Sequence, residues 1–399
     1  MHHAGKLEAA NDRDGAPPAR HAAATRAPEV RVVVSPAETA IDGLAADWEK
    51  LAQVASEPNA FAEHWFVRAS LPTMASGHDV RLMEVRRGPR LIGLLPVTVE
   101  QGYARLPVRL VKNWSHTQMF LGTPLVALGE EQAFWTAILK ALDAADWAPN
   151  FLHLRGIAEA GAVHRGLSGA ARALGRSSAT VHREVRAFLD SDLGPQAYYE
   201  RAVRQKKRKE IKRLRNRLAE LGAIEARSLA DPAALDQWCD LYLGLEQVGW
   251  KGKAGSALAD DPAGARFFRD AVKAAWAAGR LQFLRLDLKG QPIAMLVNFL
   301  TAPGSFSFKT VFDEEYARFS PGVLIQLENL NILDRPDIAW MDSCAVEDHP
   351  MIDSLWTERR AIVRVTIPLK GARRTAIFAL CRALERASAA LRAPRGSAR

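Results

Sequence analysis

The stretch from residue 306 to residue 326, FSFKTVFDEEYARFSPGVLIQ, most limits what this chain can fold into, because it predicts a buried strand, a turn and a helix in direct succession. Phe306 and Phe308 alternate with small or charged residues. One face of the strand can therefore enter a core, while the other face presents Lys309 to a cleft.

The predicted helix opens on Ser320, Pro321 and Gly322. Serine is a common N-cap, proline suits the first helical position, and glycine lets a ligand approach the backbone. Free N–H groups and the helix dipole favour an anion at such a start. Ser-Pro-Gly also opens many ordinary helices, so a purely structural role stays open. The phosphate-site hypothesis covers Ser320, Pro321, Gly322 and Val323.

The surrounding elements give a β-β-β-α-β order. A hairpin is predicted over residues 280 to 300, with its turn at Lys289-Gly290, and another strand over residues 337 to 345. This order resembles the GNAT acyltransferases, in which the equivalent helix start holds the pyrophosphate of acyl-coenzyme A. The GNAT signature, Arg or Gln, two residues, Gly, one residue, Gly or Ala, is matched only at Gly322, with Phe319 and Leu324 in the other two places.

Three longer motifs narrow the resemblance: EQVGWKGKAGSAL (246 to 258), FKTVFDEEYARFSPG (308 to 322) and MDSCAVEDHPMIDSLWTERR (341 to 360). Together they are similar to the cellulose-biosynthesis-associated (CelD/BcsL-type) acetyltransferases with a BioF2-like domain. The resemblance spans roughly residues 30 to 370. It implies an α+β fold of two tandem GNAT-like lobes, with mixed sheets flanked by helices as in the Fem-type transferases. It also implies acetyl-CoA or another acyl-CoA as co-substrate, and it names no acceptor.

Length and composition agree with two domains, because 399 residues exceed a typical single core and 48% of them are hydrophobic. In the first half, strands and helices alternate in an order similar to that of the second half. The predicted parts are a disordered tail (1–28), an N-terminal lobe (29–192), a basic connecting helix (193–222), the C-terminal acyltransferase lobe (223–372), and a helix with a tail (373–399).

The connecting segment carries the strongest charge feature. From Glu200 to Glu220 there are ten Lys or Arg residues and three Glu residues. Apolar residues at helical spacing, from Ile211 to Leu221, predict an amphipathic helix. Its basic faces have three open interpretations: a solvated connector, a site for the coenzyme 3'-phosphate or an anionic acceptor, and RNA binding. No aromatic residue interrupts the run, which disfavours nucleic acid other than a tRNA donor.

Other features limit the class of protein. No apolar stretch approaches the ~20 residues that cross a bilayer, and the N-terminus lacks the apolar core of a signal peptide, so we expect a cytoplasmic protein. Cys239, Cys344 and Cys381 are widely separated, which supports neither a disulfide framework nor a zinc site. We expect reduced thiols and no metal.

Acyl transfer needs a polarised thioester carbonyl, a deprotonated acceptor and a proton for the leaving thiolate. By resemblance, an irregular strand at 306–312 points a backbone N–H at the carbonyl. Asp342 is the leading candidate base, because burial in an apolar strand raises a carboxyl pKa unless a cation such as Lys309 or Lys251 holds it ionised. Glu246 is a further carboxylate candidate.

Each candidate also has a structural interpretation. Asp342 paired with a lysine or an arginine could simply tie the lobes together. Tyr316 could protonate the thiolate, or pack beside its turn. The substrate-side candidates are Trp250, Lys251 and Asp313. Further open candidates are His349, Cys344 as an acyl-carrying nucleophile, and the pair Arg359-Arg360, which could hold an anion or lie at a helix C-terminus.

The sequence therefore predicts transfer of an acyl group from acyl-CoA directly to an amine or hydroxyl of a small-molecule or saccharide acceptor. A Fem-like transferase that uses aminoacyl-tRNA is the second enzyme hypothesis. A non-catalytic accessory protein of exopolysaccharide synthesis is the third, and failure to bind a coenzyme A thioester would favour it. The acyl chain and the oligomeric state stay open.

Overall fold

The computed structural model describes residues 28–103 and 106–392, with the side chains of 250–251 and 389–392 left out. The tail predicted at residues 1–28 therefore lies almost wholly outside the described residues. The strands are β1 Val30–Pro36, β2 Arg81–Arg87, β3 Arg90–Tyr103, β4 Leu106–Asn113, β5 Leu125–Val126, β6 Phe151–Ala158, β7 Ala179–Asp190, β8 Ile224–Ser228, β9 Leu281–Leu288, β10 Gln291–Thr301, β11 Gly304–Phe312, β12 Trp340–Asp342 and β13 Glu358–Pro368. The α-helices are α1 Ala37–Ala40, α2 Ala45–Val54, α3 His64–Met74, α4 Glu131–Ala144, α5 Ala162–Ala173, α6 Pro195–Ala202, α7 Gln205–Ala219, α8 Leu235–Val248, α9 Trp250–Lys253, α10 Pro262–Ala277, α11 Pro321–Asn329 and α12 Ala372–Arg392.

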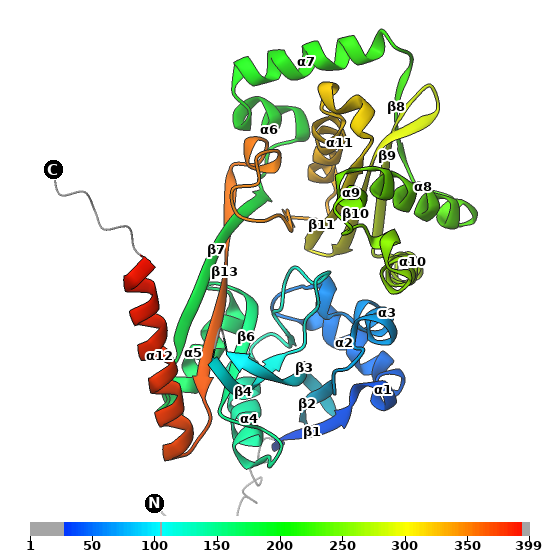
Figure 1. Cartoon of the computed structure of the whole chain (residues 1–399). Helices are drawn as coiled ribbons and strands as arrows, with labels where there is room; N and C mark the ends of the chain where they lie inside the picture. Colours follow the sequence, from blue (N-terminus) through cyan, green and yellow to red (C-terminus); the bar gives the residue numbers. More distant parts are fainter. Residues whose placement is uncertain (1–27, 104–105, 393–399) are drawn as a thin grey trace, which may run out of the picture.

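The described strands join into one mixed sheet in the order β1-β2-β3-β4-β6-β13-β7-β12-β11-β10-β9-β8, with β5 paired to β3. The first half of the chain builds one end of this sheet and the second half builds the other end (Figure 1). The fold is α+β, as the sequence predicts.

In the second half, the β-β-β-α-β order is confirmed. β9 and β10 form the expected hairpin, β10 and β11 pair antiparallel, and β11 reaches its parallel neighbour β12 through α11. β10 is buried on both faces: Met295 and Val297 pack with the cluster formed by α8 and α10, whereas Leu296 packs with α7 and α11. This two-sided burial explains its long apolar run.

The two halves are bound together by the last strand. β13 lies between β6 and β7 and pairs antiparallel with both, while β7 continues the sheet into β12. Arg359 and Arg360 therefore lie in a strand, and the helix C-terminus that the sequence analysis allowed for them is wrong. The lobe boundaries themselves stay a prediction.

The basic segment contains two helices, α6 and α7, separated at Val203 and Arg204. The single amphipathic helix expected there is therefore broken. In α7, Ile211 and Leu218 are buried, and the helix contacts α11 and the 3₁₀ helix η5, Glu314–Phe319. Phe378 and Cys381 of α12 pack on the cluster around Phe151. α12 lies beside β13 (Figure 1).

The three cysteines are free and buried. Among the described helices, none combines the length and apolar character needed to cross a membrane. Within the same residues, no group of three or more His, Cys, Asp or Glu side chains is arranged to hold a metal ion.

Candidate active site

A pocket of about 620 Å³ lies where β11 and β12 diverge. The two parallel strands pair only from Gly304 to Phe306 on β11 and from Trp340 to Asp342 on β12. β11 then continues, whereas the chain after β12 turns at Cys344, whose φ is +54°. The pocket occupies the space between these segments, and its lining comes from β11, η5, α11, the segment after β12 and one residue of the first half. The lining residues are Phe120, Ser307, Phe308, Lys309, Thr310, Phe312, Ala317, Ser320, Gly322, Val323, Gln326, Ser343, Cys344, Ala345, Val346, His349, Met351 and Ile352.

β11 is irregular at the pocket. Val297 on β10 lies opposite Lys309, but the next residue, Asn298, lies opposite Ser307. Phe308 is therefore an extra residue, a bulge that falls outside the ladder with β10. The pairing between β11 and β12 has already ended at Phe306, so this edge of β11 has no partner strand beside the pocket. The irregular strand expected at 306–312 is present.

The start of α11 forms another wall of the pocket, through Ser320, Gly322 and Val323. Ser320 occupies the N-cap position in a left-handed conformation, with φ 55° and ψ 54°, and its side chain makes no capping hydrogen bond. The predicted N-cap position of Ser320 is therefore confirmed, but without the side-chain hydrogen bond that usually goes with it. The N–H groups of Val323 and Leu324 donate to the Ser320 carbonyl. Pro321 has no N–H, so the Gly322 amide is the donor left in this first turn of the described structure.

The backbone at Gly322 packs closely against two side chains. A Cβ there would lie 3.1 Å from Met351 Sδ and 3.2 Å from Phe312 Cδ1. Lys309 lines the same pocket and places a cation in it, with Nζ 5.7 Å from the centre of the Phe308 ring. The N-terminus of α11 and a lysine therefore line one cavity.

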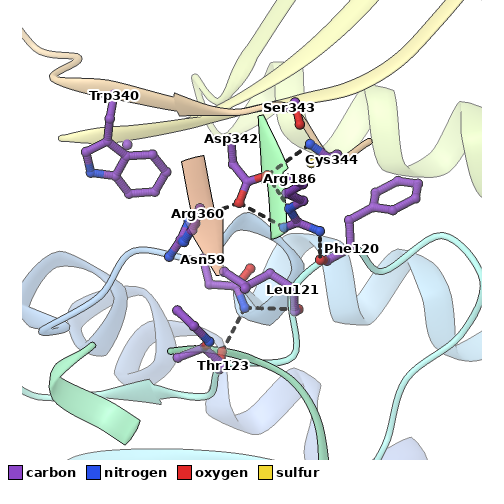
Figure 2. Close-up of polar contacts among 12 residues, drawn as sticks. Asn59, Phe120, Leu121, Thr123, Arg186, Trp340, Asp342, Ser343, Cys344 and Arg360 are labelled. Atoms are coloured by element: carbon purple, nitrogen blue, oxygen red, sulfur yellow. Dashed lines mark hydrogen bonds and ion pairs between the residues drawn. The ribbon is translucent and has the colours of Figure 1, made fainter. Parts of the chain in front are cut away.

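Asp342 is completely buried and bound by two arginines (Figure 2). Arg186 of β7, itself 3% exposed, places Nε 2.7 Å from Oδ1 and donates from Nη2 to Oδ2 at 2.8 Å. Arg360 of β13 donates to Oδ2 at 3.1 Å, and the Cys344 N–H donates to Oδ1 at 2.9 Å. Burial alone raises the pKa of Asp342, but Arg186, Arg360 and the Cys344 N–H outweigh it, so the pKa lies below its ordinary value.

The pKa of Asp342 is therefore lowered, because cations hold the carboxylate ionised, as the sequence allowed. These cations are Arg186 and Arg360, whereas Lys309 or Lys251 was expected. A carboxylate held ionised by two guanidinium groups is a poor proton acceptor. Arg186 also donates from Nη1 to the Phe120 carbonyl at 2.7 Å. The contacts match the other predicted role of Asp342, a tie between the two halves of the sheet.

The remaining predicted residues lie apart from the pocket lining or have structural contacts. Glu246 is buried in α8 and accepts a hydrogen bond from the Leu258 N–H at 2.9 Å. Tyr316 is half-buried in η5 against an apolar cluster. Asp313 caps η5 by accepting from the Glu315 N–H. Trp250 and Lys251 open α9, and their side chains lie outside the described structure.

Two open candidates do line the pocket. Cys344 is buried, and burial together with Asp342 raises the pKa of its thiol well above the ordinary value, the opposite of what an acyl-carrying thiolate needs. His349 is half-buried, and its Nδ1 has no hydrogen-bond partner among the described residues.

Sequence reasoning missed Phe120, Arg186 and Gln326, and it named Arg360 as a residue that could hold an anion but not as a partner of Asp342. Arg186 directly precedes the apolar run 187–189 at the end of β7, which was a signal for its burial, but its partner lies 156 positions away. Gln326 donates to Thr310 Oγ1 at 3.1 Å and so fixes α11 against β11. A polar residue on the buried face of an apolar helix was the available signal for it.

Comparison with known proteins agrees with this geometry. Residues 205–345, which include β11, α11 and most of the pocket lining, match the model of a family described as acetyltransferase (GNAT) domain. A search of curated protein sequences gave no match.

Solved structures of similar fold cover nearly the whole chain. FemX aligns with a TM-score of 0.55 at 10% identity, covering 84% of this chain and 97% of FemX. A conserved protein of unknown function from Bacteroides thetaiotaomicron VPI-5482 aligns with a TM-score of 0.51 at 11% identity, over 82% and 97% of the two chains. A tandem GNAT protein from the clavulanic acid biosynthesis pathway gives 0.46 at 18% identity, over 86% and 100%. At these identities the first two likenesses show the fold alone.

Proposed function

We propose that this chain, which matches the GNAT acetyltransferase domain model over residues 205–345, transfers an acyl group from acyl-coenzyme A, acetyl-CoA first, to an amine or hydroxyl. The observation that carries the proposal is the coincidence of two features in one pocket. The bulge at Phe308 supplies a backbone donor for a thioester oxygen, and the α11 start at Gly322 supplies a place for pyrophosphate.

In this proposal the coenzyme would lie along the pocket, held by the Gly322 amide and by the charge of Lys309. The acceptor nitrogen or oxygen forms a bond to the thioester carbon, and the C–S bond breaks with its electron pair on sulfur. The acceptor loses one proton and the coenzyme thiol gains one. The β11 donor would stabilise the oxyanion that forms in between.

Direct transfer of the acyl group, without an acyl-enzyme, agrees with the protonated state of the Cys344 thiol at the pocket. A covalent acyl-enzyme would need Cys344 as a thiolate, and burial favours its protonated form. The carboxylate of Asp342 would serve to hold Arg186 and Arg360, and through them the segment that lines the pocket.

The finer assignment is part of the proposal. The motifs at 246–258, 308–322 and 341–360 support a CelD/BcsL-type protein with a BioF2-like domain, acting on a small-molecule or saccharide acceptor in polysaccharide or cell-envelope metabolism. A cytoplasmic location belongs with it, because the reaction consumes acyl-coenzyme A.

A second candidate is a Fem-like transferase with an aminoacyl-tRNA donor. One observation favours it. α7 contacts η5 and α11, so the exposed lysines and arginines of α7 lie next to two helices that line the pocket. Those exposed side chains are Lys206, Lys209, Lys212, Arg213, Arg215 and Arg217. tRNA binding that weakens steeply with salt would support this candidate.

Calorimetric titration with acetyl-CoA tests the proposal. Wild type should bind with a Kd in the micromolar range, about −8 kcal/mol. Gly322→Glu should abolish binding, because its carboxylate repels the pyrophosphate and fills its space. Gly244→Glu is the matched control, since a Cβ at Gly244 in α8 meets no atom within 4 Å. Absence of binding by folded wild type would move the assignment to the tRNA-dependent or the non-catalytic, accessory role.

A further inference from the structure

A second pocket, of about 400 Å³, lies against the first at the boundary between the two halves of the chain. Its floor comes from β6, β7 and β13, and its walls come from the loop at 115–122 and the segment after β12. The two pockets share Phe120, Cys344, Ala345 and Val346. The two pockets therefore adjoin at these residues.

Two arginines face this second pocket without a partner. Arg155 of β6 and Arg364 of β13 both line it. Their strands are neighbours, and the register between them is broken here: Val363 lies opposite Ile157, but Val365 lies opposite Leu154. Neither guanidinium has an ion pair or hydrogen bond with any other residue that the structure describes. Burial and the nearby Arg155 lower the pKa of Arg364, which shows that the two cations repel each other.

The backbone under Arg155 is tightly held. Asn113 accepts from the Arg155 N–H at 2.8 Å and donates to its carbonyl at 2.9 Å. The Gly122 N–H donates to the Gly156 carbonyl at 2.7 Å, and a Cβ on Gly122 would overlap the Arg155 carbonyl oxygen. The backbone that carries Arg155 is therefore held in one conformation, as the backbone of a binding site must be.

The charges that line this second pocket leave it positive. Arg186 pairs with Asp342, which also pairs with Arg360, so this group does not make the pocket negative. Burial lowers the pKa of His116 to about 3, so this side chain is neutral at pH 7. Glu184 is the one acidic side chain in the lining, against Arg155 and Arg364. An anion between the two guanidinium groups would relieve their repulsion and bind through charge-assisted hydrogen bonds.

We propose that the second pocket holds the acyl acceptor, and that Arg155 and Arg364 together bind an anionic group of it, a carboxylate or a phosphate. The inference rests on the proposed function, because the acyl donor occupies the first pocket. Glu184, on the same floor, suits the amine of such an acceptor, which gives the pocket opposite charges for the two ends of one molecule.

The test is the rate at which phenylglyoxal modifies each arginine of the full chain, followed by peptide mass spectrometry with and without coenzyme A. Reactions run in sodium chloride, sodium phosphate and sodium acetate at one ionic strength. Arg155 and Arg364 should react at least threefold more slowly in phosphate or in acetate than in chloride. Arg183 is the internal control, because it is exposed, pairs with Glu159 and does not line the pocket, so its rate should stay constant.

Variants show whether the two arginines act as one site. Arg155→Gln should abolish the protection of Arg364 by the anion, whereas Arg183→Gln should leave it intact. Protection by phosphate alone assigns a phosphorylated acceptor, and protection by acetate alone assigns a carboxylate. Equal rates in all three salts, or protection of Arg364 that survives Arg155→Gln, would overturn the proposal.

The acetyl-CoA titration tests the proposed function separately. Arg155→Gln should keep the wild-type Kd for acetyl-CoA, because this arginine lines the second pocket and not the first. Acetyl-CoA binding without protection of the arginines by an anion would support the proposed acyltransferase function and contradict the proposed acceptor site. Protection of Arg155 and Arg364 without acetyl-CoA binding would support an anion site and contradict the proposed acyltransferase function.

Discussion

Replacing Asp342 with asparagine separates a structural carboxylate from a catalytic base. The substitution keeps the shape but removes the one negative charge that Arg186, which is 3% exposed, and Arg360 both contact. Leaving a buried guanidinium without its partner costs about 3–5 kcal/mol. We therefore expect Asp342→Asn to lower the free energy of unfolding by about that amount at pH 7, measured by urea denaturation.

Asp337→Asn is the matched control. Asp337 is an exposed aspartate that pairs with Arg335 at 2.8 Å, and pairs of this kind contribute about 0–1 kcal/mol. A double variant, Arg186→Met with Asp342→Leu, should recover part of the loss, because it removes both buried charges at once.

The pH dependence of the Asp342 effect has a fixed sign. The folded pKa of Asp342 lies below the unfolded value, near 3.8, so the carboxylate stabilises the fold at pH above that value. The stability difference between wild type and Asp342→Asn should therefore be complete at pH 7 and shrink as the pH falls through the folded pKa. If Asp342→Asn stays within 1 kcal/mol of wild type while acyl transfer falls more than 100-fold, the carboxylate acts on the substrate and our reasoning is refuted.

Three further predictions follow from the packing. Gly122→Ala should cost about 1–3 kcal/mol in urea unfolding, because its Cβ overlaps the Arg155 carbonyl, whereas Gly43→Ala, in open space, should cost under 1 kcal/mol. Cys344→Ser should keep acyl transfer within about tenfold of wild type, and intact mass spectrometry should detect no acyl-enzyme in either protein. Burial lowers the pKa of His116 and His153 to about 3, so the unfolded chain takes up protons first, and stability should fall by roughly 1 kcal/mol per histidine from pH 7 to pH 5.5; a flat profile there would contradict it.

Local sequence patterns predicted the strands and the helix of the second half well, because neighbouring residues determine where each of these elements begins and turns. Lys289 and Gly290 adopt positive φ, as a tight turn requires, so the β9–β10 hairpin could be read from the chain. Pro321 marked the start of α11 for a similar reason. The conformation of Ser320 could not be read, because its left-handed φ is set by how η5 meets α11.

Partners distant in sequence could not be predicted. β13 shows the apolar pattern of a strand, but nothing local states that it lies between β6 and β7. The same holds for Asp342, whose burial was expected, while Arg186 and Arg360 reach it only through that strand order. The two arginines of the second pocket, Arg155 and Arg364, lie 209 positions apart and are brought together by the β6–β13 pairing.

The structure of the chain in complex with acetyl-CoA tests the central claim most directly. Our account predicts the coenzyme in the pocket between β11 and the segment after β12, with its pyrophosphate at the Gly322 amide and its thioester oxygen within 3.2 Å of a backbone nitrogen at the Phe308 bulge. A coenzyme bound elsewhere, or a thioester that does not reach the bulge, would contradict it.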